Sequence, residues 1–168
     1  MFCHQCEQAA KGIGCDVMGV CGKKPDVAAL QDNLLYGLKG LAFFADKARK
    51  LGAKEQGIDA FMLEGLFTTV TNVDFDPARL EATIRKCFEM KEQARALYEG
   101  AFSTANGIKA RQFNDGPAAW APAGDLVKQG EQYGILALHE NEDIRSAIEI
   151  LIYGLKGMAA YADHCQIL

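Results

Sequence analysis

Residues 34–51 read LLYGLKGLAFFADKARKL, and this stretch decides the fold. Its apolar residues recur at spacings of three and four, which is the period of an amphipathic helix. The pattern begins earlier, at Pro25, a residue that suits the first turn of a helix, and it ends before Gly52, which is typical of a helix C-terminus. The sequence therefore predicts a helix from Pro25 to about Gly52.

The same stretch returns at residues 151–168, which read LIYGLKGMAAYADHCQIL. Ten of the eighteen positions are identical, each 117 residues after its counterpart. Helices often reuse Leu, Ala and Lys, but YGLKG followed in register by AD is too specific for that explanation, so we interpret the pair as a duplication. Glycine weakens a helix by about 1 kcal/mol relative to alanine, so the two glycines that recur in both copies indicate close helix packing. These are Gly37 and Gly40, with Gly154 and Gly157.

Two further helices are predicted between the copies of the repeat. One fits residues 58–72, and the next begins at Asp76 and Pro77, a capping residue followed by proline at the first helical position. Short turns join them to the first helix, which favours an antiparallel three-helix bundle over residues 25–102. No strand is predicted, so the expected fold class is all-α.

Residues 103–140 are predicted to be a crossover loop. Five glycine and proline residues interrupt any period early in this segment, and a loop of this length is unusual in a compact domain. We therefore expect it to pack as an ordered segment through the single tryptophan, Trp120. A last helix is predicted over residues 141–168, and its sequence repeats that of the first helix. The first copy is followed by two more helices, whereas the second copy is not. The sequence thus predicts one complete bundle and the first helix of a second, incomplete bundle.

The chain has 168 residues, 49% of them hydrophobic, which is enough for one domain with a substantial core. Its net charge of −4 argues against a nucleic-acid surface, and no apolar run reaches the ~20 residues that span a bilayer. The first residues lack the basic and apolar regions of a signal peptide. We therefore expect a cytoplasmic protein that binds neither nucleic acid nor membrane. In that reducing compartment, clustered cysteines bind metal more often than they form disulfides.

Four of the six cysteines lie within residues 1–24, a segment without helical or alternating period that we predict to be a loop. Their spacing is C-x2-C-x8-C-x5-C. Four thiolates close a tetrahedral zinc site or hold an iron–sulfur cluster, and adjacent glycines let backbone N–H groups approach sulfur. The pattern favours a metal over four free buried cysteines, but the spacing alone leaves zinc and iron open. The candidate ligands are Cys3, Cys6, Cys15 and Cys21.

The other candidates have simpler explanations. His4 lies between two of the cysteines and is predicted to be a solvated loop histidine rather than a residue that adjusts a cluster's electrostatics. The lysines that flank the cysteines could offset the negative charge of a thiolate-ligated cluster, although we favour solvated side chains. The two remaining cysteines lie on apolar helical stripes and are predicted to be packing residues. The flanking lysines are Lys11, Lys23 and Lys24, and the two remaining cysteines are Cys87 and Cys165.

The cysteine motif with the following GVCGKKP, LQD and LLYGLKGLAFFADK resembles the N-terminus of the hybrid cluster proteins, also called prismane proteins or hydroxylamine reductases. The resemblance continues at LEGLFTTVTNVDFD and ILALHENEDIRSAIEILIYGLKGMAAYA, so it covers essentially the whole chain. It implies an N-terminal helical domain of two three-helix bundles, related to that of the nickel carbon monoxide dehydrogenases. It also implies a [4Fe–4S] cluster held by Cys3, Cys6, Cys15 and Cys21, because family members with wider spacing carry [2Fe–2S] clusters instead.

The resemblance further implies a catalytic centre that this sequence lacks. In the family, a second, iron–sulfur–oxygen hybrid cluster is held by His, Glu and Cys ligands from two C-terminal α/β domains. We therefore assign no catalytic residue and expect this chain to be inactive alone. The expected function is an iron–sulfur electron-transfer module served by an electron donor protein, in a family that reduces hydroxylamine to ammonia and takes part in nitric oxide metabolism. A different class stays open, namely a non-redox helical binding or dimerisation module stabilised by zinc.

The last helix carries an apolar stripe that the rest of a second bundle would cover. Burial of each Leu or Ile is worth about 1.5–3 kcal/mol, so exposure of several is unfavourable. We therefore expect a homo-oligomer formed through this helix, most simply a two-fold dimer. The stripe comprises Ile148, Leu151, Ile152, Leu155, Met158, Ala159 and Ala162.

Overall fold

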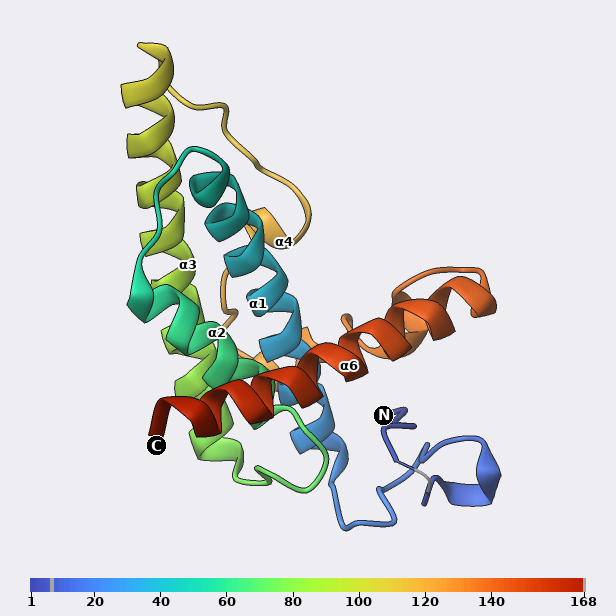
Figure 1. The fold of residues 1–168 in the computed structure, drawn as a ribbon. Coiled ribbons are helices and arrows are strands. Elements are labelled where there is room, and N and C mark those ends of the chain that lie inside the picture. The colour runs from blue at the N-terminus through green and yellow to red at the C-terminus, as the bar shows by residue number, and fades with distance from the viewer. Residues whose placement is uncertain (7, 168) are drawn as a thin grey trace.

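The structure is a computed structural model that describes residues 1–6 and 8–167. Six α-helices and two short 3₁₀ helices make up this part of the chain (Figure 1). None of the described residues belongs to a strand, so the all-α prediction is confirmed for them.

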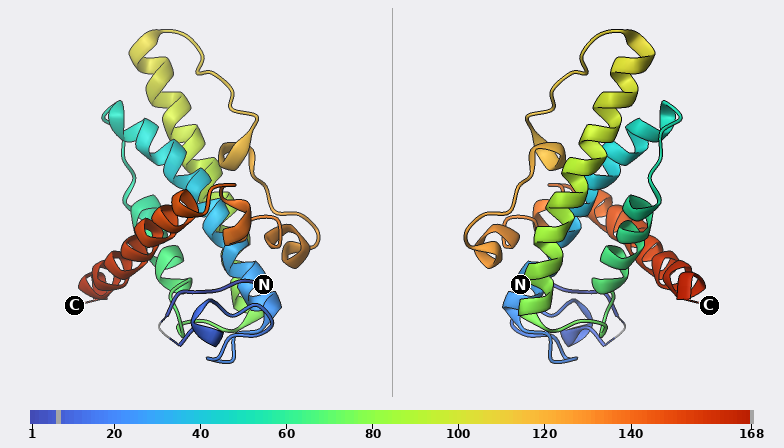
Figure 2. Two further views of the ribbon diagram at one scale, coloured as in Figure 1. Left: turned by 90° about the vertical axis from the view of Figure 1, so that its right-hand side faces the viewer. Right: turned by 90° about the vertical axis from the view of Figure 1, so that its left-hand side faces the viewer.

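Helices α1 (Pro25–Lys50) and α3 (Pro77–Asn106) lie side by side and form the body of the molecule (Figures 1 and 2). Both begin with proline, as predicted, and Asp76 caps α3 by accepting a hydrogen bond from the N–H of Ala78. Their facing apolar residues supply most of the core. The most deeply buried are Leu30, Leu34, Leu38, Leu41 and Phe44 of α1, and Leu80, Ile84, Cys87 and Ala94 of α3.

Helix α2 (Gln56–Thr68) is shorter than the predicted span of 58–72. It starts two residues earlier because the Glu55 carboxylate caps it, accepting a hydrogen bond from the N–H of Ile58 at 2.8 Å. It ends four residues earlier, and the connection to α3 then passes through Asn72, whose φ of 63° is left-handed and cannot continue a helix. This connection reaches the cysteine-rich loop, where Thr71 contacts Gln5.

The segment between α3 and α6 is ordered, as expected, but it is not one loop. It contains α4 (Gly116–Ala119), α5 (Leu126–Gly130) and the 3₁₀ helix η2 (Ile135–Ala137). Trp120 is 4% exposed, and its Nε1 donates a hydrogen bond to Asn33 Oδ1 of α1 at 3.0 Å. The prediction that this segment packs through Trp120 is therefore confirmed.

Helix α6 (Glu142–Ile167) is capped by Asn141, whose Oδ1 accepts hydrogen bonds from the N–H groups of Asp143 and Ile144. It packs across α2 at an angle to the α1–α3 pair (Figures 1 and 2). Of its predicted apolar stripe, Ile152 and Ala159 are buried by the chain itself. Leu151, Leu155 and Met158 are 65%, 43% and 69% exposed.

The face that α6 buries therefore differs from the predicted one. Every third or fourth residue turns inward, and this inward row alternates charged and apolar residues. The expectation that the whole stripe lacks a cover within this chain was thus wrong for two of its members. The inward row is Glu149, Ile152, Lys156 and Ala159.

In the described part of the chain, we find no helix with both the length and the apolar character that a bilayer crossing requires.

Candidate metal centre

The four candidate cysteines line one small cavity. The cavity lies between the N-terminal loop and the connection from α2 to α3, which contributes Thr71 to its wall. Gln5, between two of the cysteines, approaches this connection, with its Oε1 accepting a hydrogen bond from Thr71 Oγ1 at 3.3 Å. The fold thus brings the four predicted site residues to one place, although their role as ligands stays a prediction.

Backbone hydrogen bonds connect two of these cysteines directly. Cys3 and Cys15 form an antiparallel bridge in which each N–H donates to the other's carbonyl, at 3.0 and 2.8 Å. Residues paired in this way carry their side chains on the same face of the pair. Cys15 is buried, and the N–H of Ala10 points at its Sγ with an N···S distance of 3.5 Å.

Tight turns hold the fourth cysteine. The N–H of Gly19 donates to the carbonyl of Lys23 at 2.8 Å, and Gly22, at a φ of +91°, completes the turn around Cys21. A Cβ atom on Gly19 would stand 3.0 Å from Cys21 Sγ, so glycine is needed for this approach of backbone to sulfur. Gly19 thus lies close to the Cys21 thiol, but its N–H donates to a carbonyl, and the backbone N–H that reaches a sulfur is that of Ala10.

The donor set fits an iron–sulfur cluster by its chemistry. Thiolates are the ligands of such clusters, and four of them are needed for a [4Fe–4S] group. Four thiolates can equally close a tetrahedral zinc site, so the donor set alone suits either group. Among residues 1–6 and 8–167, no three His, Cys, Asp or Glu side chains are grouped tightly enough to hold one ion.

Lys23 corrects one sequence interpretation. It was predicted to be solvated, but it is 2% exposed and lines the cysteine cavity. Its ammonium donates to Gln31 Oε1 at 2.6 Å, and Gln31 in turn donates to the carbonyl of Asp74 at 3.0 Å. Lys11 and Lys24 are exposed, as predicted.

A group of charged residues that the sequence interpretation missed lies beside this site. Lys156 of α6 is 5% exposed, and burial together with nearby Lys23 lowers its pKa to about 8. Burial raises the pKa of Asp32 on α1 to about 7, and the neighbouring Glu149 carboxylate adds to this rise. Burial also lowers the pKa of Lys39. The signal that could have found this group is the repeat, because the same offset of 117 residues relates Lys39 to Lys156 and Asp32 to Glu149.

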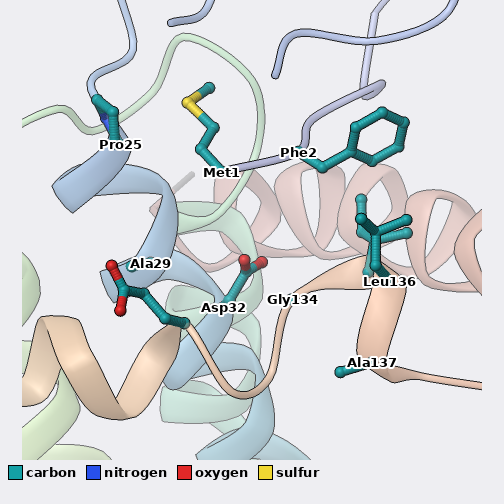
Figure 3. A pocket seen from close by; sticks show the side chains of 10 residues that line it. Met1, Phe2, Pro25, Ala29, Asp32, Gly134, Leu136 and Ala137 are labelled. Carbon is teal, nitrogen blue, oxygen red and sulfur yellow. The ribbon is translucent and has the colours of Figure 1, made fainter. Parts of the chain in front are cut away.

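Asp32 also reaches a second cavity, of about 480 Å³, at the N-terminal end of α1. Its carboxylate projects from the helix toward the space between Met1 and Leu136 (Figure 3). Phe2 and Met1 of the N-terminal segment also line this cavity (Figure 3). The charged group is therefore bounded by the N-terminal segment on one side and by α6 on the other.

The remaining candidates lie away from the cysteine cavity. Cys87 is fully buried in the core, and burial raises the pKa of its thiol to about 12, as expected of a packing residue. Cys165 is exposed, so its predicted packing role was wrong. His4 is not simply solvated, because its Nε2 lies 3.9 Å from Glu149 Oε2.

Comparisons with known proteins agree over the whole length. Residues 1–168 match the prismane/CO dehydrogenase family. A hydroxylamine reductase of Geobacter metallireducens is 67% identical over 171 residues, covering 100% of this chain and 31% of that protein. Those of Geobacter sulfurreducens and Halothermothrix orenii are 66% and 44% identical, again over 100% of this chain and 31% and 30% of theirs. The chain thus spans less than a third of the length of these curated relatives.

Proposed function

Because the chain belongs to the prismane/CO dehydrogenase family, we propose that it is the iron–sulfur electron-transfer part of a hydroxylamine-reductase-type protein. The observation that carries this proposal is the convergence of four cysteines on one cavity. The relatives are named hydroxylamine reductases, so reduction of hydroxylamine to ammonia, with a place in nitric oxide metabolism, is proposed for the longer protein.

In this proposal Cys3, Cys6, Cys15 and Cys21 hold a [4Fe–4S] cluster. Such a cluster, when bound, takes up and releases single electrons, and hydrogen bonds to its sulfurs and nearby charge set its potential. The chain's own contribution is to present these thiols on a loop that backbone pairing has already partly ordered. The N–H of Ala10 adds a hydrogen bond to Cys15 Sγ, and Lys23 adds a buried positive charge at the cavity wall.

The outer surface of the loop suggests where an electron donor protein docks. Four large apolar side chains of this loop are exposed. Val20 lines the cysteine cavity itself, so a partner bound to this surface would come close to the thiols. Clustered exposed apolar side chains typically mark interaction sites. The exposed residues are Ile13, Val17, Met18 and Val20.

Chain purified without oxygen provides the test. Iron and acid-labile sulfide assays should each give about four atoms per chain, with the visible absorption of an iron–sulfur cluster and a paramagnetic resonance signal after reduction. Stoichiometric zinc without iron would contradict the proposal and would favour a zinc-stabilised helical binding or dimerisation module.

A further inference from the structure

The internal repeat relates two pairs of charged residues beside the cysteine site. Lys39 of α1 and Lys156 of α6 are equivalent positions, 117 residues apart. The same offset relates Asp32 to Glu149. Both lysines lie near both carboxylates, and each carboxylate opposes the lowering of the lysine pKa values. Duplication has therefore placed two acidic and two basic side chains together where α6 passes α1.

The two equivalent lysines, Lys39 and Lys156, differ in their neighbours. The Lys156 side chain borders a small cavity that it shares with Gln5 and Thr71, and these two residues also line the cysteine cavity. The thiol of Cys3 is close enough to act on the pKa of Lys156. For Lys39, the acting charges are the two carboxylates. Gln5 and Thr71 thus border both the cavity of Lys156 and the cavity of the cysteines.

Burial of Lys156 next to Lys23 is unfavourable unless an anion lies nearby. Lys156 is 5% exposed, Lys23 is 2% exposed, and the Lys23 ammonium disfavours the charge on Lys156. The Glu149 and Asp32 carboxylates act on Lys156, but neither forms an ion pair with it among the described residues. Its Nζ instead donates a hydrogen bond to the carbonyl of Thr69 at 3.2 Å, which satisfies a donor but does not neutralise a charge. Buried charges are normally paired or bound to a counter-charge. A group ligated by four thiolates carries negative charge, and this charge increases by one when it accepts an electron.

We propose that Lys156 is an electrostatic positioning residue of the four-cysteine centre, whose buried ammonium stabilises the electron that the centre accepts. The inference rests on the proposed function, because it needs a redox-active group at the cysteines. In the step concerned, the centre gains one electron, a low-potential reductant such as dithionite loses one, and no bond is broken. Lys156 touches no reacting atom and acts through its fixed charge alone.

The test compares the midpoint potentials of the cluster-loaded chain and three variants by mediated titration. Lys156→Gln removes the charge but keeps an N–H donor for Thr69. Lys39→Gln makes the same change at the repeat-equivalent position, and Lys156→Arg keeps the charge. At the wild-type midpoint, Lys156→Gln should lower the ratio of reduced to oxidised centre about tenfold, which is ~59 mV for one electron. Lys39→Gln should change this ratio less than twofold, and Lys156→Arg should restore it.

A second measurement does not depend on the folding of Lys156→Gln. The groups that face Lys156 are Lys23 of the loop, Asp32 of α1, Glu149 of α6 and Cys3. Burial and Lys23 lower the pKa of the Lys156 ammonium, whereas arginine keeps its proton, so the wild-type potential should fall more than that of Lys156→Arg as the pH is raised from 7.

Three outcomes would overturn the inference. A loaded Lys156→Gln chain with the wild-type potential would do so while leaving the proposed function standing. An equal shift in Lys39→Gln would show that the effect is not specific to the residue facing the cysteines. A wild-type chain that binds no iron and sulfide would overturn both this inference and the proposed function.

Discussion

Trp120 lies against Gly37 so closely that a Cβ atom at Gly37 would stand 2.7 Å from Cη2 of the indole. The same Cβ would be 3.1 Å from Cys87 Sγ, so the helix pair and the crossover segment meet at this one position. Gly40, one turn further, lies against the backbone carbonyl of Pro117. Around the repeat-equivalent Gly154 and Gly157, no described atom would come within 4 Å of such a Cβ.

This difference predicts opposite effects for one substitution at two equivalent positions. Gly37→Ala should lower the free energy of unfolding by about 1–3 kcal/mol, because the buried indole has no room to move. Gly154→Ala should raise it by up to about 1 kcal/mol, because alanine is the better helix former and nothing is displaced. Urea unfolding of both variants checks the pair. Equal effects would show that the second copy is as tightly packed as the first.

Loss of any candidate ligand should empty the metal centre. Serine at position 3, 6, 15 or 21 should reduce bound iron and sulfide to a small fraction of wild type, because each thiolate is expected to ligate its own iron. Cys165→Ser and Cys87→Ala are the controls, since one thiol is exposed and the other lies in the core. Assay of iron, sulfide and zinc after anaerobic purification gives the answer. Full iron retention in one of the four serine variants would remove that residue from the ligand set.

The chain alone should not reduce hydroxylamine at an enzymatic rate. Reduction at nitrogen needs an open metal position, and a cluster with a cysteine on every iron offers none. With reduced methyl viologen as donor, dye oxidation should match that of the Cys21→Ser variant. The longer hydroxylamine reductase of Geobacter metallireducens serves as the positive control. Turnover by the 168-residue chain comparable to that control would place an active site within it.

The exposed face of α6 should cause self-association. Leu151 and Leu155 are repeat-equivalent to Leu34 and Leu38 of α1, which are fully buried, so α6 presents outward the face that α1 packs inward. Sedimentation at micromolar concentration should detect a dimer, and Leu151→Glu with Leu155→Glu should abolish it.

The control for this experiment adds the same charge elsewhere. Ala82→Glu with Ala96→Glu modifies two exposed positions of α3 and should leave the dimer intact. A monomeric wild-type chain would contradict the prediction, as would a dimer that both double variants weaken equally.

Asp32 should make stability depend on pH. Its pKa is raised from 3.8 to about 7, so between these values the folded chain binds more protons than the unfolded chain. Stability from this group is therefore fully present below pH 3.8 and is lost as the pH rises toward 7. Asp32→Asn cannot titrate. As the pH rises across this window, the free energy of unfolding of this variant should therefore increase relative to that of the wild type, by up to about 1.4 kcal/mol per pH unit. Parallel urea titrations at several pH values measure the difference, and a constant difference would contradict the assignment.

Local signals explain why much of the fold could be predicted. Pro25, and Asp76 with Pro77, mark helix starts through backbone chemistry that needs no tertiary contact, and both helices begin there. Helices α4 and α5 could not be predicted, because helices of four and five residues depend on surrounding contacts such as the hydrogen bond from Trp120 to Asn33.

The positions of the candidate thiols could be predicted from the sequence, but the burial of the charged residues beside them could not. Cysteine spacing is visible in the sequence, whereas burial of Lys23 depends on Gln31 and on the connection after α2. The sequence also did not show which face of α6 packs against the rest of the chain. Apolar periodicity favoured a row through Leu151 and Leu155, but α2 covers the row that includes Lys156.

The backbone bridge between Cys3 and Cys15 has a consequence for the chain when it carries no metal. Residues that exchange both hydrogen bonds in an antiparallel pair have Cα atoms about 5.5 Å apart. This spacing is within the range that a disulfide spans. Exposure of the empty loop to air would thus let dioxygen oxidise these two thiols to a cystine, and iron could then enter only after a thiol reductant had reopened the bond. The same backbone pairing that brings two candidate ligands together would therefore also favour a bond between them.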